Sequence, residues 1–112
     1  MSDDCIFCKI AKKEIPAKIR YEDDEVIAFD DIDPKAPTHI LIIPKTHINS
    51  ISALGDDEIS TVSKLITAAK KIAEQEKIAS FRLVFNSGRD AGMEIDHLHL
   101  HLLGGTKLGP MA

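Results

Sequence analysis

Hydrophobic residues recur along the chain with two different periods, and each change of period marks an expected element. After the acidic segment 56–58, apolar residues three and four positions apart predict one long amphipathic helix that runs to about Lys77. The acidic residues at its start favour the positive end of the helix dipole. A shorter helical pattern covers residues 5–12 and stops before Pro16, because a proline ring does not fit a helix interior.

Five segments carry the alternating or continuous apolar pattern of β-strands. The first two flank an acidic turn, which is a hairpin signal, and the third follows a rigid loop that contains two prolines. The expected strands are 19–22, 26–30, 38–44, 81–86 and 97–103, with a loop at 87–92. Strand hairpins beside one dominant helix predict an α+β fold with an antiparallel sheet.

Size and charge narrow the class of protein. The 112 residues fit one domain, and 44% hydrophobic with 29% charged residues are typical of a globular protein. The net charge of −4 argues against a nucleic acid partner, which would favour a basic stripe. The N-terminus is polar and acidic at residues 2–4, and the apolar runs are much shorter than a bilayer span. We therefore expect a cytoplasmic protein with no membrane partner.

Three histidines, His97, His99 and His101, alternate with leucines near the C-terminus. In a strand, residues two apart are about 6.6–6.8 Å apart on one face, so the imidazoles would share a face and the leucines would pack in the core. Imidazole can act as nucleophile, proton carrier or metal ligand near neutral pH. The pattern alone leaves three interpretations: an exposed strand face, a catalytic metal site with two or three histidine ligands, or nucleotidyl transfer through a histidine nucleophile.

The two cysteines, Cys5 and Cys8, have the spacing of half a zinc site. In a reducing compartment such a pair is more typical of metal binding or redox chemistry than of a structural disulfide. A structural zinc site needs four ligands, so this pair would need two more. The spacing alone leaves a metal pair, a redox pair and two metal-free thiols open.

The segment 97–103, His-Leu-His-Leu-His-Leu-Leu, resembles the signature of the histidine triad (HIT) family. Further family motifs follow in order along nearly the whole chain, at 5–10, 13–18, 36–39, 43–48 and 103–105. The chain is most similar to the Hint branch, whose members hydrolyse adenosine or guanosine phosphoramidates and aminoacyl adenylates. The resemblance implies a single domain over residues 1–112, a five-stranded antiparallel sheet with one long and one short helix, and a homodimer.

The resemblance assigns the central reaction to His99, which matches the family nucleophile. It would attack the α-phosphorus, expel an amine and leave a nucleotidyl-imidazole that water then hydrolyses. His101 and His39 match family positions near the phosphate, where they would handle protons and bind phosphate oxygens. Asn86 matches a residue beside the scissile phosphate, where a neutral amide stabilises charge. The family implies no cofactor for the chemistry itself.

Other matched positions would hold a purine nucleotide. Asp31 matches the residue that binds the ribose hydroxyls, and a loop of three residues would offer backbone donors to the phosphate. That loop consists of Gly92, Met93 and Glu94. The apolar pocket for the base would contain Ile6, Phe7, Ile10, Phe29 and Ile32. Ordinary core packing would explain these five apolar residues equally well.

The family also implies how the cysteine pair completes a metal site. Members that keep both cysteines add two histidines, which here are His47 and His97. A structural zinc ion held by the four residues would fix the N-terminal helix to the sheet and orient the strand that carries His99. His97 would then serve the metal and leave catalysis to the other two histidines of the row.

Several positions depart from the commoner family pattern and leave the substrate open. Met93 replaces a frequent glutamine, Asp96 replaces a frequent aromatic residue, and Glu94 replaces the serine of animal members, although bacterial members often carry glutamate. The leading hypothesis is a nucleoside phosphoramidase. The alternatives are a dinucleoside polyphosphate hydrolase, a nucleotide-sensing adaptor with incidental hydrolysis, and a metal-dependent hydrolase.

Overall fold

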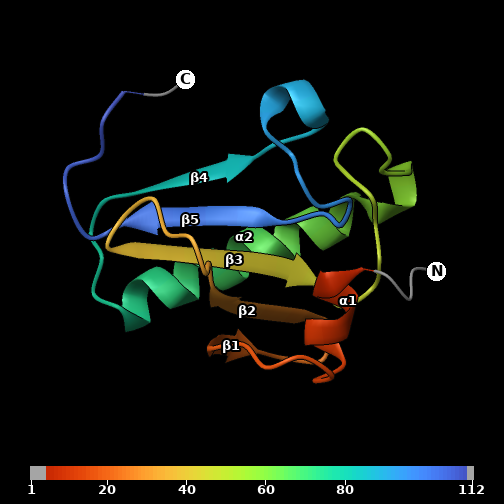
Figure 1. Ribbon diagram of the computed structural model, residues 1–112, viewed down its shortest axis with the longest axis horizontal. Coiled ribbons are helices and arrows are strands. Elements are labelled where there is room, and N and C mark those ends of the chain that lie inside the picture. Colours follow the sequence, from red (N-terminus) through yellow and green to blue (C-terminus); the bar gives the residue numbers. More distant parts are fainter. Residues whose placement is uncertain (1–4, 111–112) are drawn as a thin grey trace.

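A five-stranded antiparallel sheet forms the centre of the molecule, with its strands in the order β1-β2-β3-β5-β4 (Figure 1). The computed structural model describes residues 5–110; the polar start at residues 2–4 and the tail end at Ala112 lie outside the described residues. The strands are β1 (Ile19–Glu22), β2 (Val26–Asp30), β3 (Thr38–Pro44), β4 (Phe81–Phe85) and β5 (Leu100–Gly104). The helices are α1 (Ile6–Ala11), η1 (Asp56–Glu58), α2 (Ile59–Gln75) and η2 (Arg89–Ala91). The predicted α+β fold is confirmed.

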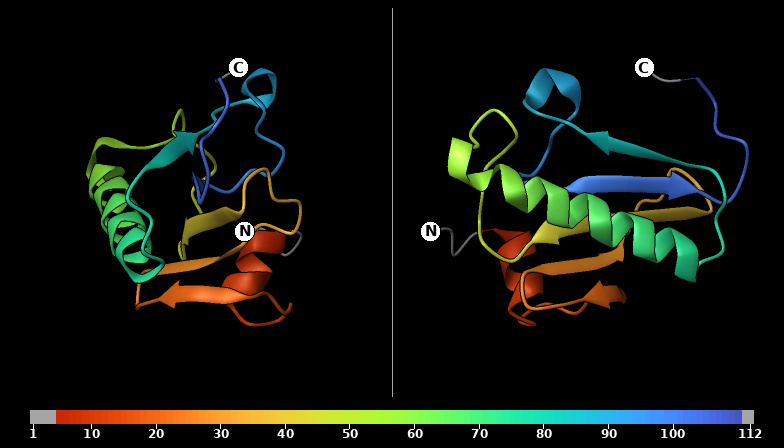
Figure 2. Two further views of the ribbon diagram at one scale, coloured as in Figure 1. Left: turned by 90° about the vertical axis from the view of Figure 1, so that its left-hand side faces the viewer. Right: turned by 180° about the vertical axis from the view of Figure 1, so that it is seen from behind.

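The two helices cover opposite faces of the sheet. Figure 2 shows the long helix α2 lying across one face, while α1 packs on the other face over β2 and β3. Ile40 and Ile42 of β3 point into the core under α2, whereas Leu41 and Ile43 point into the core under α1. Because both faces of β3 are buried, its sequence is a continuous apolar run without polar alternation.

The long helix begins as predicted but is built from two parts. Residues Asp56–Glu58 form a turn of 3₁₀-helix before the α-helix starts at Ile59. The Glu58 side chain accepts a hydrogen bond from the Gly55 amide at 2.8 Å, which satisfies one of the amides at the helix start. The α-helix ends at Gln75, two residues before the expected end, and Lys77 has a positive φ of 59°.

The last strand is shorter than predicted, because it begins at Leu100 and not at His97. The register pairs Ile42 with Leu100, so Leu98 would lie opposite Pro44. A proline has no amide hydrogen to give, and its carbonyl oxygen is instead 2.9 Å from His97 Nε2. The Leu98 amide turns to the Ile48 carbonyl at 2.6 Å, so the ladder stops before the first two histidines.

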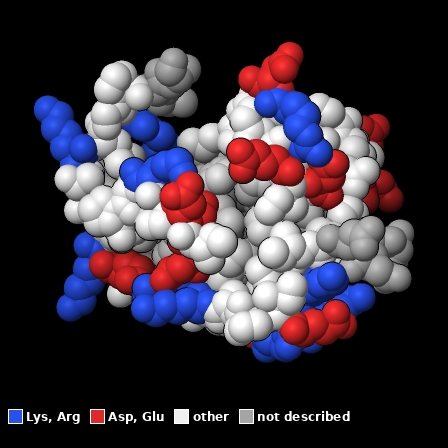
Figure 3. All heavy atoms as spheres, in the orientation of Figure 1, with Lys and Arg blue, Asp and Glu red and all other residues white. Residues whose placement is uncertain are grey.

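The predicted strand 81–86 ends one residue earlier, at Phe85, and the predicted loop 87–92 contains η2. Within residues 5–110, no helix combines the length and apolar composition that crossing a bilayer requires. On the face seen in Figure 3, acidic and basic side chains lie next to one another.

Candidate active site

The histidine row lies on the α1 side of the sheet, at the point where the chain enters β5. Leu98, Leu100 and Leu102 are buried in the core under α2. The imidazoles of His97 and His99 pack against the ring of Phe7 in α1, on the opposite face. The alternation of side chains therefore continues through residues 97–99, although the ladder of backbone hydrogen bonds begins later.

The backbone fixes which nitrogen of His99 carries a hydrogen. Its Nδ1 atom is 2.7 Å from the carbonyl oxygen of His97. A carbonyl oxygen only accepts, so Nδ1 must donate, and in the neutral ring the lone pair is then on Nε2. Phe7 packs nearly perpendicular to the ring, with 5.1 Å between the centroids, and limits its rotation. The neutral form of His99 therefore has its lone pair on Nε2 and its hydrogen on Nδ1.

A chain of hydrogen bonds sets the other two imidazoles. The Lys35 amide donates to His39 Nδ1 at 3.0 Å, so the hydrogen of neutral His39 is on Nε2. That nitrogen is 2.9 Å from His101 Nδ1 and donates to it. His101 therefore carries its own hydrogen on Nε2. Burial, together with the neighbouring His99 and His39, lowers the pKa of His101 to about 4. Burial also lowers the pKa of His39, although Asp31 opposes the shift.

The potential ligand atoms of Asp31, His39 and His101 also lie within 4.8 Å of one another, as a catalytic metal site would require. Such an ion would need the lone pair of His39 Nε2. The Lys35 amide already donates to Nδ1 of that ring, so Nε2 holds the hydrogen that it gives to His101. The hydrogen-bonded arrangement therefore favours a proton-handling pair over a catalytic metal centre.

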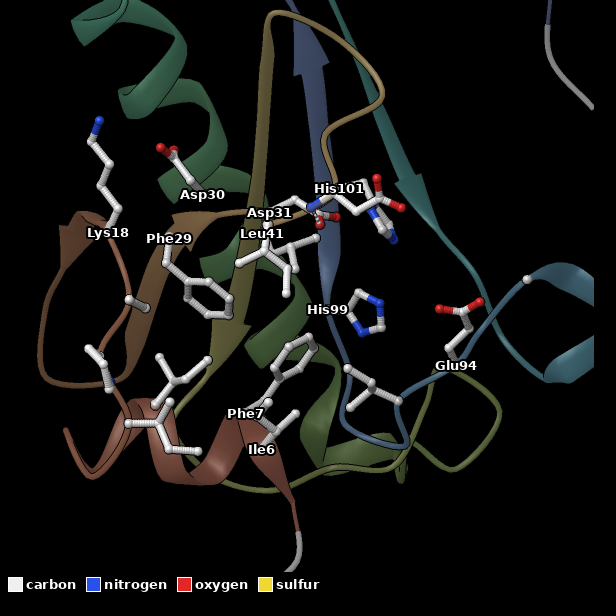
Figure 4. A pocket seen from close by; sticks show the side chains of 18 residues that line it. Ile6, Phe7, Lys18, Phe29, Asp30, Asp31, Leu41, Glu94, His99 and His101 are labelled. Atoms are coloured by element: carbon white, nitrogen blue, oxygen red, sulfur yellow. Dashed lines mark hydrogen bonds between the residues drawn. The ribbon is translucent and has the colours of Figure 1, made fainter.

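A cavity of about 590 Å³ opens in front of His99 and extends between α1 and β2 (Figure 4). Its polar residues include Asp31, Glu94, His99 and His101. The five residues expected around the base all line it: Ile6, Phe7, Ile10, Phe29 and Ile32. Ile32 is 98% exposed and stands at the rim. The motif comparison missed Ile15, Leu41 and Ile95, which also line this cavity. Alternation along β3 would have identified Leu41, whereas the other two lie in loops without a local signal.

A second cavity of about 580 Å³ adjoins the first. The two share five lining residues, which are Asp31, Asp33, Gly92, Glu94 and His101. Asn86 lines this second cavity, on the other side of His101 from the apolar pocket, together with Lys35 and Arg82. The two cavities form a continuous groove past the histidines.

The loop at 92–94 differs in part from the expectation. Met93 is buried and lines neither cavity, and its amide donates to the Gly88 carbonyl at 3.1 Å. The Gly92 amide donates to the Arg89 carbonyl at 3.0 Å. Both amides are therefore used to close the loop around η2 and are not directed into the groove. Gly92 has a φ of +100°, a conformation that favours glycine.

Four residues that are distant in sequence meet at the start of α1, namely Cys5, Cys8, His47 and His97. Their ligand atoms all lie within 4.8 Å of one another. Cys5 Sγ is 3.3 Å from His97 Nδ1, and Cys8 Sγ is 3.2 Å from His47 Nδ1. A tetrahedral zinc ion with bonds of about 2.3 Å to sulfur and 2.0 Å to nitrogen would separate such atoms by about 3.5 Å. The cluster therefore has the donor set and the size of a zinc site.

The hydrogen bonds of the far nitrogens of both imidazoles are compatible with metal binding by this cluster. His47 Nε2 is 2.7 Å from Asn49 Oδ1, and His97 Nε2 is 2.9 Å from the Pro44 carbonyl. Both oxygens accept hydrogen bonds, so each Nε2 donates and each Nδ1 presents its lone pair to the cysteines. Asn49 was not anticipated, because an asparagine two residues after a ligand carries no recognisable motif. His97 thus joins two sites: its ring belongs to the metal cluster and its carbonyl orients His99.

Comparison with known protein families gives a match to one domain model. Residues 4–110 match the family described as scavenger mRNA decapping enzyme C-term binding. Among characterised proteins, the chain is 50% identical over 113 residues to the purine nucleoside phosphoramidase of Escherichia coli (strain K12), covering 99% of this chain and 95% of the relative.

Solved structures agree with these sequence matches. A histidine triad protein from Clostridium difficile has 45% identity and a TM-score of 0.97, and the alignment covers 100% of this chain and 99% of that one. A HIT family hydrolase from Legionella pneumophila has 47% identity and a TM-score of 0.92, with 95% and 96% of the two chains covered. Similarity therefore extends over the sheet, both helices and the histidine row.

Proposed function

The chain belongs to the histidine triad (HIT) family, and from this premise we propose that it is a purine nucleoside phosphoramidase. The substrate would be a purine nucleoside monophosphate linked through nitrogen to an amine, or an aminoacyl adenylate. The observation that carries the proposal is the 2.7 Å hydrogen bond from His99 Nδ1 to the His97 carbonyl. It leaves Nε2 as a nucleophile beside the apolar cavity, next to His101, which lines both cavities.

In the first step, the Nε2 lone pair of His99 attacks the α-phosphorus and the P–N bond breaks. The departing nitrogen takes the bonding electrons and needs a proton, because an amide anion is a poor leaving group. His101 is placed to give it. The negative phosphate would raise the pKa of His101 on binding, so that its ring takes a proton from solvent and donates it to the amine.

In the second step, water attacks the phosphorus of the nucleotidyl-His99 intermediate. His101 Nε2, which gave its hydrogen to the amine in the first step and now holds a lone pair, takes the proton of the attacking water, and the P–Nε2 bond returns its electrons to His99. The products are a nucleoside monophosphate and a free amine. The hydrogen bond from His39 orients the neutral ring of His101 before the substrate binds.

The remaining groove residues would bind the nucleotide. Asp31 lies on the loop after β2 at the edge of the apolar cavity, where a carboxylate can accept from both ribose hydroxyls. The purine would lie among the apolar side chains of α1 and β2. Asn86 lines the second cavity beside His101, where its amide can donate to a phosphate oxygen.

Covalent trapping tests the proposal. Wild-type protein is quenched in acid-free denaturant during turnover of adenosine phosphoramidate, and the modified peptide is mapped by mass spectrometry. We expect an adenylyl group on His99 and loss of turnover by about a thousandfold or more in His99→Ala. Adenylylation elsewhere, or full turnover without His99, would refute the mechanism. Faster turnover of diadenosine polyphosphates would favour the polyphosphate hydrolase, and tight AMP binding without turnover would favour a nucleotide-sensing adaptor.

We further propose that Cys5, Cys8, His47 and His97 hold one structural zinc ion. The donor set and the two fixed tautomers support this assignment. The ion would supply four bonds that tie α1 to the sheet and would take no part in the reaction. A metal-binding thiol pair also supports a cytoplasmic location, where thiols stay reduced.

A homodimer is the proposed assembly. The edge strand β4 exposes Phe81 and Leu83, which a second copy of the chain could cover. The mixture of acidic and basic side chains on the viewed face and the net charge of −4 support the view that no nucleic acid binds (Figure 3).

A further inference from the structure

Glu94 lies where the two cavities meet. It is one of the five residues that line both, and Figure 4 shows its carboxylate extending from the loop after η2 toward the side of the groove that holds His99. An in-line displacement places the leaving group opposite the attacking atom. A base in the apolar cavity and attack by His99 would therefore send the amine into the second cavity, past Glu94.

The loop that carries Glu94 is fixed on both sides. Arg89 Nη1 donates to the Met93 carbonyl at 2.7 Å, and Arg89 Nη2 pairs with Asp96 at 3.0 Å. Met93 is buried and anchors the loop from below. Asp96, which departs from the commoner family pattern, thus has a structural role as the partner of Arg89. Because residues on each side are held, the backbone of Glu94 has a defined place beside the groove.

Of the other three carboxylates of the groove, Asp30 and Asp33 have cationic partners, whereas Asp31 accepts from the Asp33 amide and lies 3.4 Å from His39. Arg20 binds Asp30 through two hydrogen bonds of 2.7 and 3.0 Å, and Lys35 pairs with Asp33 at 2.8 Å. In contrast, no hydrogen bond or ion pair engages the Glu94 side chain anywhere in residues 5–110. Its negative charge is therefore available to a bound molecule.

Neither cation of the second cavity forms an ion pair with Glu94. Lys35 is paired with Asp33 and interacts with Glu94 only through the longer-range attraction of their charges. Arg82 Nη2 donates to the Gly109 carbonyl in the C-terminal segment. Val84 pairs with His101, so Arg82 lies two residues farther along β4, away from the loop that carries Glu94. The leaving group consequently meets the carboxylate at the phosphate end of the cavity.

We propose that Glu94 determines leaving-group specificity by favouring amines that carry a positive charge and disfavouring anionic leaving groups such as nucleotides. This inference rests on the phosphoramidase function. Phosphoramidates and dinucleoside polyphosphates would bind through the same nucleotide and react with the same histidine. The charge of the leaving group is what would distinguish the two classes of substrate. A carboxylate near a bound cation stabilises it, whereas a bound anion at the same place is repelled.

The test uses three adenosine 5′-phosphoramidates of similar length, made from 1,4-diaminobutane, n-butylamine and 4-aminobutyrate. Their leaving groups end in a cation, a methyl group and an anion. We expect wild-type kcat/KM to decrease in that order. In Glu94→Gln, the ratio of the cationic to the anionic substrate should fall about fivefold or more at low salt, and by less at 0.5 M salt. The matched control Glu74→Gln removes the same charge from an exposed position on α2 and should leave the ratio unchanged.

The outcomes separate this inference from the proposed function. Equal use of all three substrates by the wild type, or an equal loss on all three in Glu94→Gln, would overturn the inference and leave the phosphoramidase function intact. Failure to cleave any of them would refute the function. In that case, the dissociation constants of the three compounds, measured by calorimetry, still test Glu94: equal values in the wild type would overturn its role.

Discussion

At the scale of single residues, the site is defined by which nitrogen of each imidazole carries hydrogen. Two backbone groups determine this: the His97 carbonyl acts on His99, and the Lys35 amide acts on His39. His39 Nε2 then donates to His101 Nδ1, so the hydrogen of neutral His101 is on Nε2. In the proposed mechanism, His99 thereby presents a lone pair for attack, His101 presents an N–H donor, and His39 orients His101. Their different roles follow from neighbouring main-chain atoms.

The buried histidines also predict a dependence of stability on pH. Burial lowers the pKa of His101 to about 4, whereas an unfolded histidine titrates near 6.5. Between these values the unfolded chain binds a proton that the folded chain does not. The free energy of unfolding should therefore fall as the pH decreases from about 6.5 toward 4, and be insensitive to this group above that range. We expect the urea midpoint to decrease less in His101→Asn than in the wild type over this window. Parallel profiles for the two proteins would contradict the lowered pKa.

At the scale of elements, α1 belongs to two sites at once. Its N-cap residue Cys5 and its third residue Cys8 lie in the metal cluster, while Ile6, Phe7 and Ile10 line the apolar cavity. Only six residues form the helix, and an isolated helix this short is unstable in water. The position of the pocket wall should therefore depend on the four metal ligands.

Removing the metal should weaken nucleotide binding as well as lower stability. We expect wild-type protein to contain about one zinc per chain and Cys8→Ser to contain little. The dissociation constant for AMP, measured by calorimetry, should rise about tenfold in Cys8→Ser, because the wall formed by α1 loosens. Lys9→Ser changes the adjacent residue of the same helix without removing a ligand and should bind AMP normally. Unchanged AMP affinity in zinc-free protein would show that α1 is held without the metal.

How far the sequence predicts the molecule depends on whether a feature is local. Periodicity located β1, β2 and β3 to the residue, because apolar alternation and flanking prolines act at short range. The predicted start of β5 at His97 was wrong, because the backbone hydrogen bonds between β3 and β5 stop where Leu98 lies opposite Pro44. Family motifs brought together the metal ligands, but not Asn49, whose role depends on the orientation of a ring. That the Glu94 side chain forms no ion pair within residues 5–110 likewise emerges only when the partners of the other acids are known.

At the scale of the whole molecule, the two edges of the sheet differ. β1 has four residues, is irregular in its pairing with β2, and carries Arg20, which forms ion pairs with Asp30 and Glu76. β4 is a regular edge with two half-exposed apolar side chains, Phe81 and Leu83. Charges and irregularity discourage strand pairing, whereas a regular apolar edge permits it. The asymmetry indicates β4 as the edge that meets a second chain.

One substitution on each edge tests this assembly. Leu83→Lys adds a charge to the β4 edge and should convert a dimer to a monomer at micromolar concentrations, with a dimer dissociation constant raised about a hundredfold. Ile19→Lys makes the same kind of change at a similarly exposed apolar residue on β1 and should leave the dimer intact. Sedimentation velocity measures both, and circular dichroism checks that each variant is folded. Dissociation caused by Ile19→Lys but not by Leu83→Lys would place the interface on the opposite edge, and a monomeric wild type would remove it altogether.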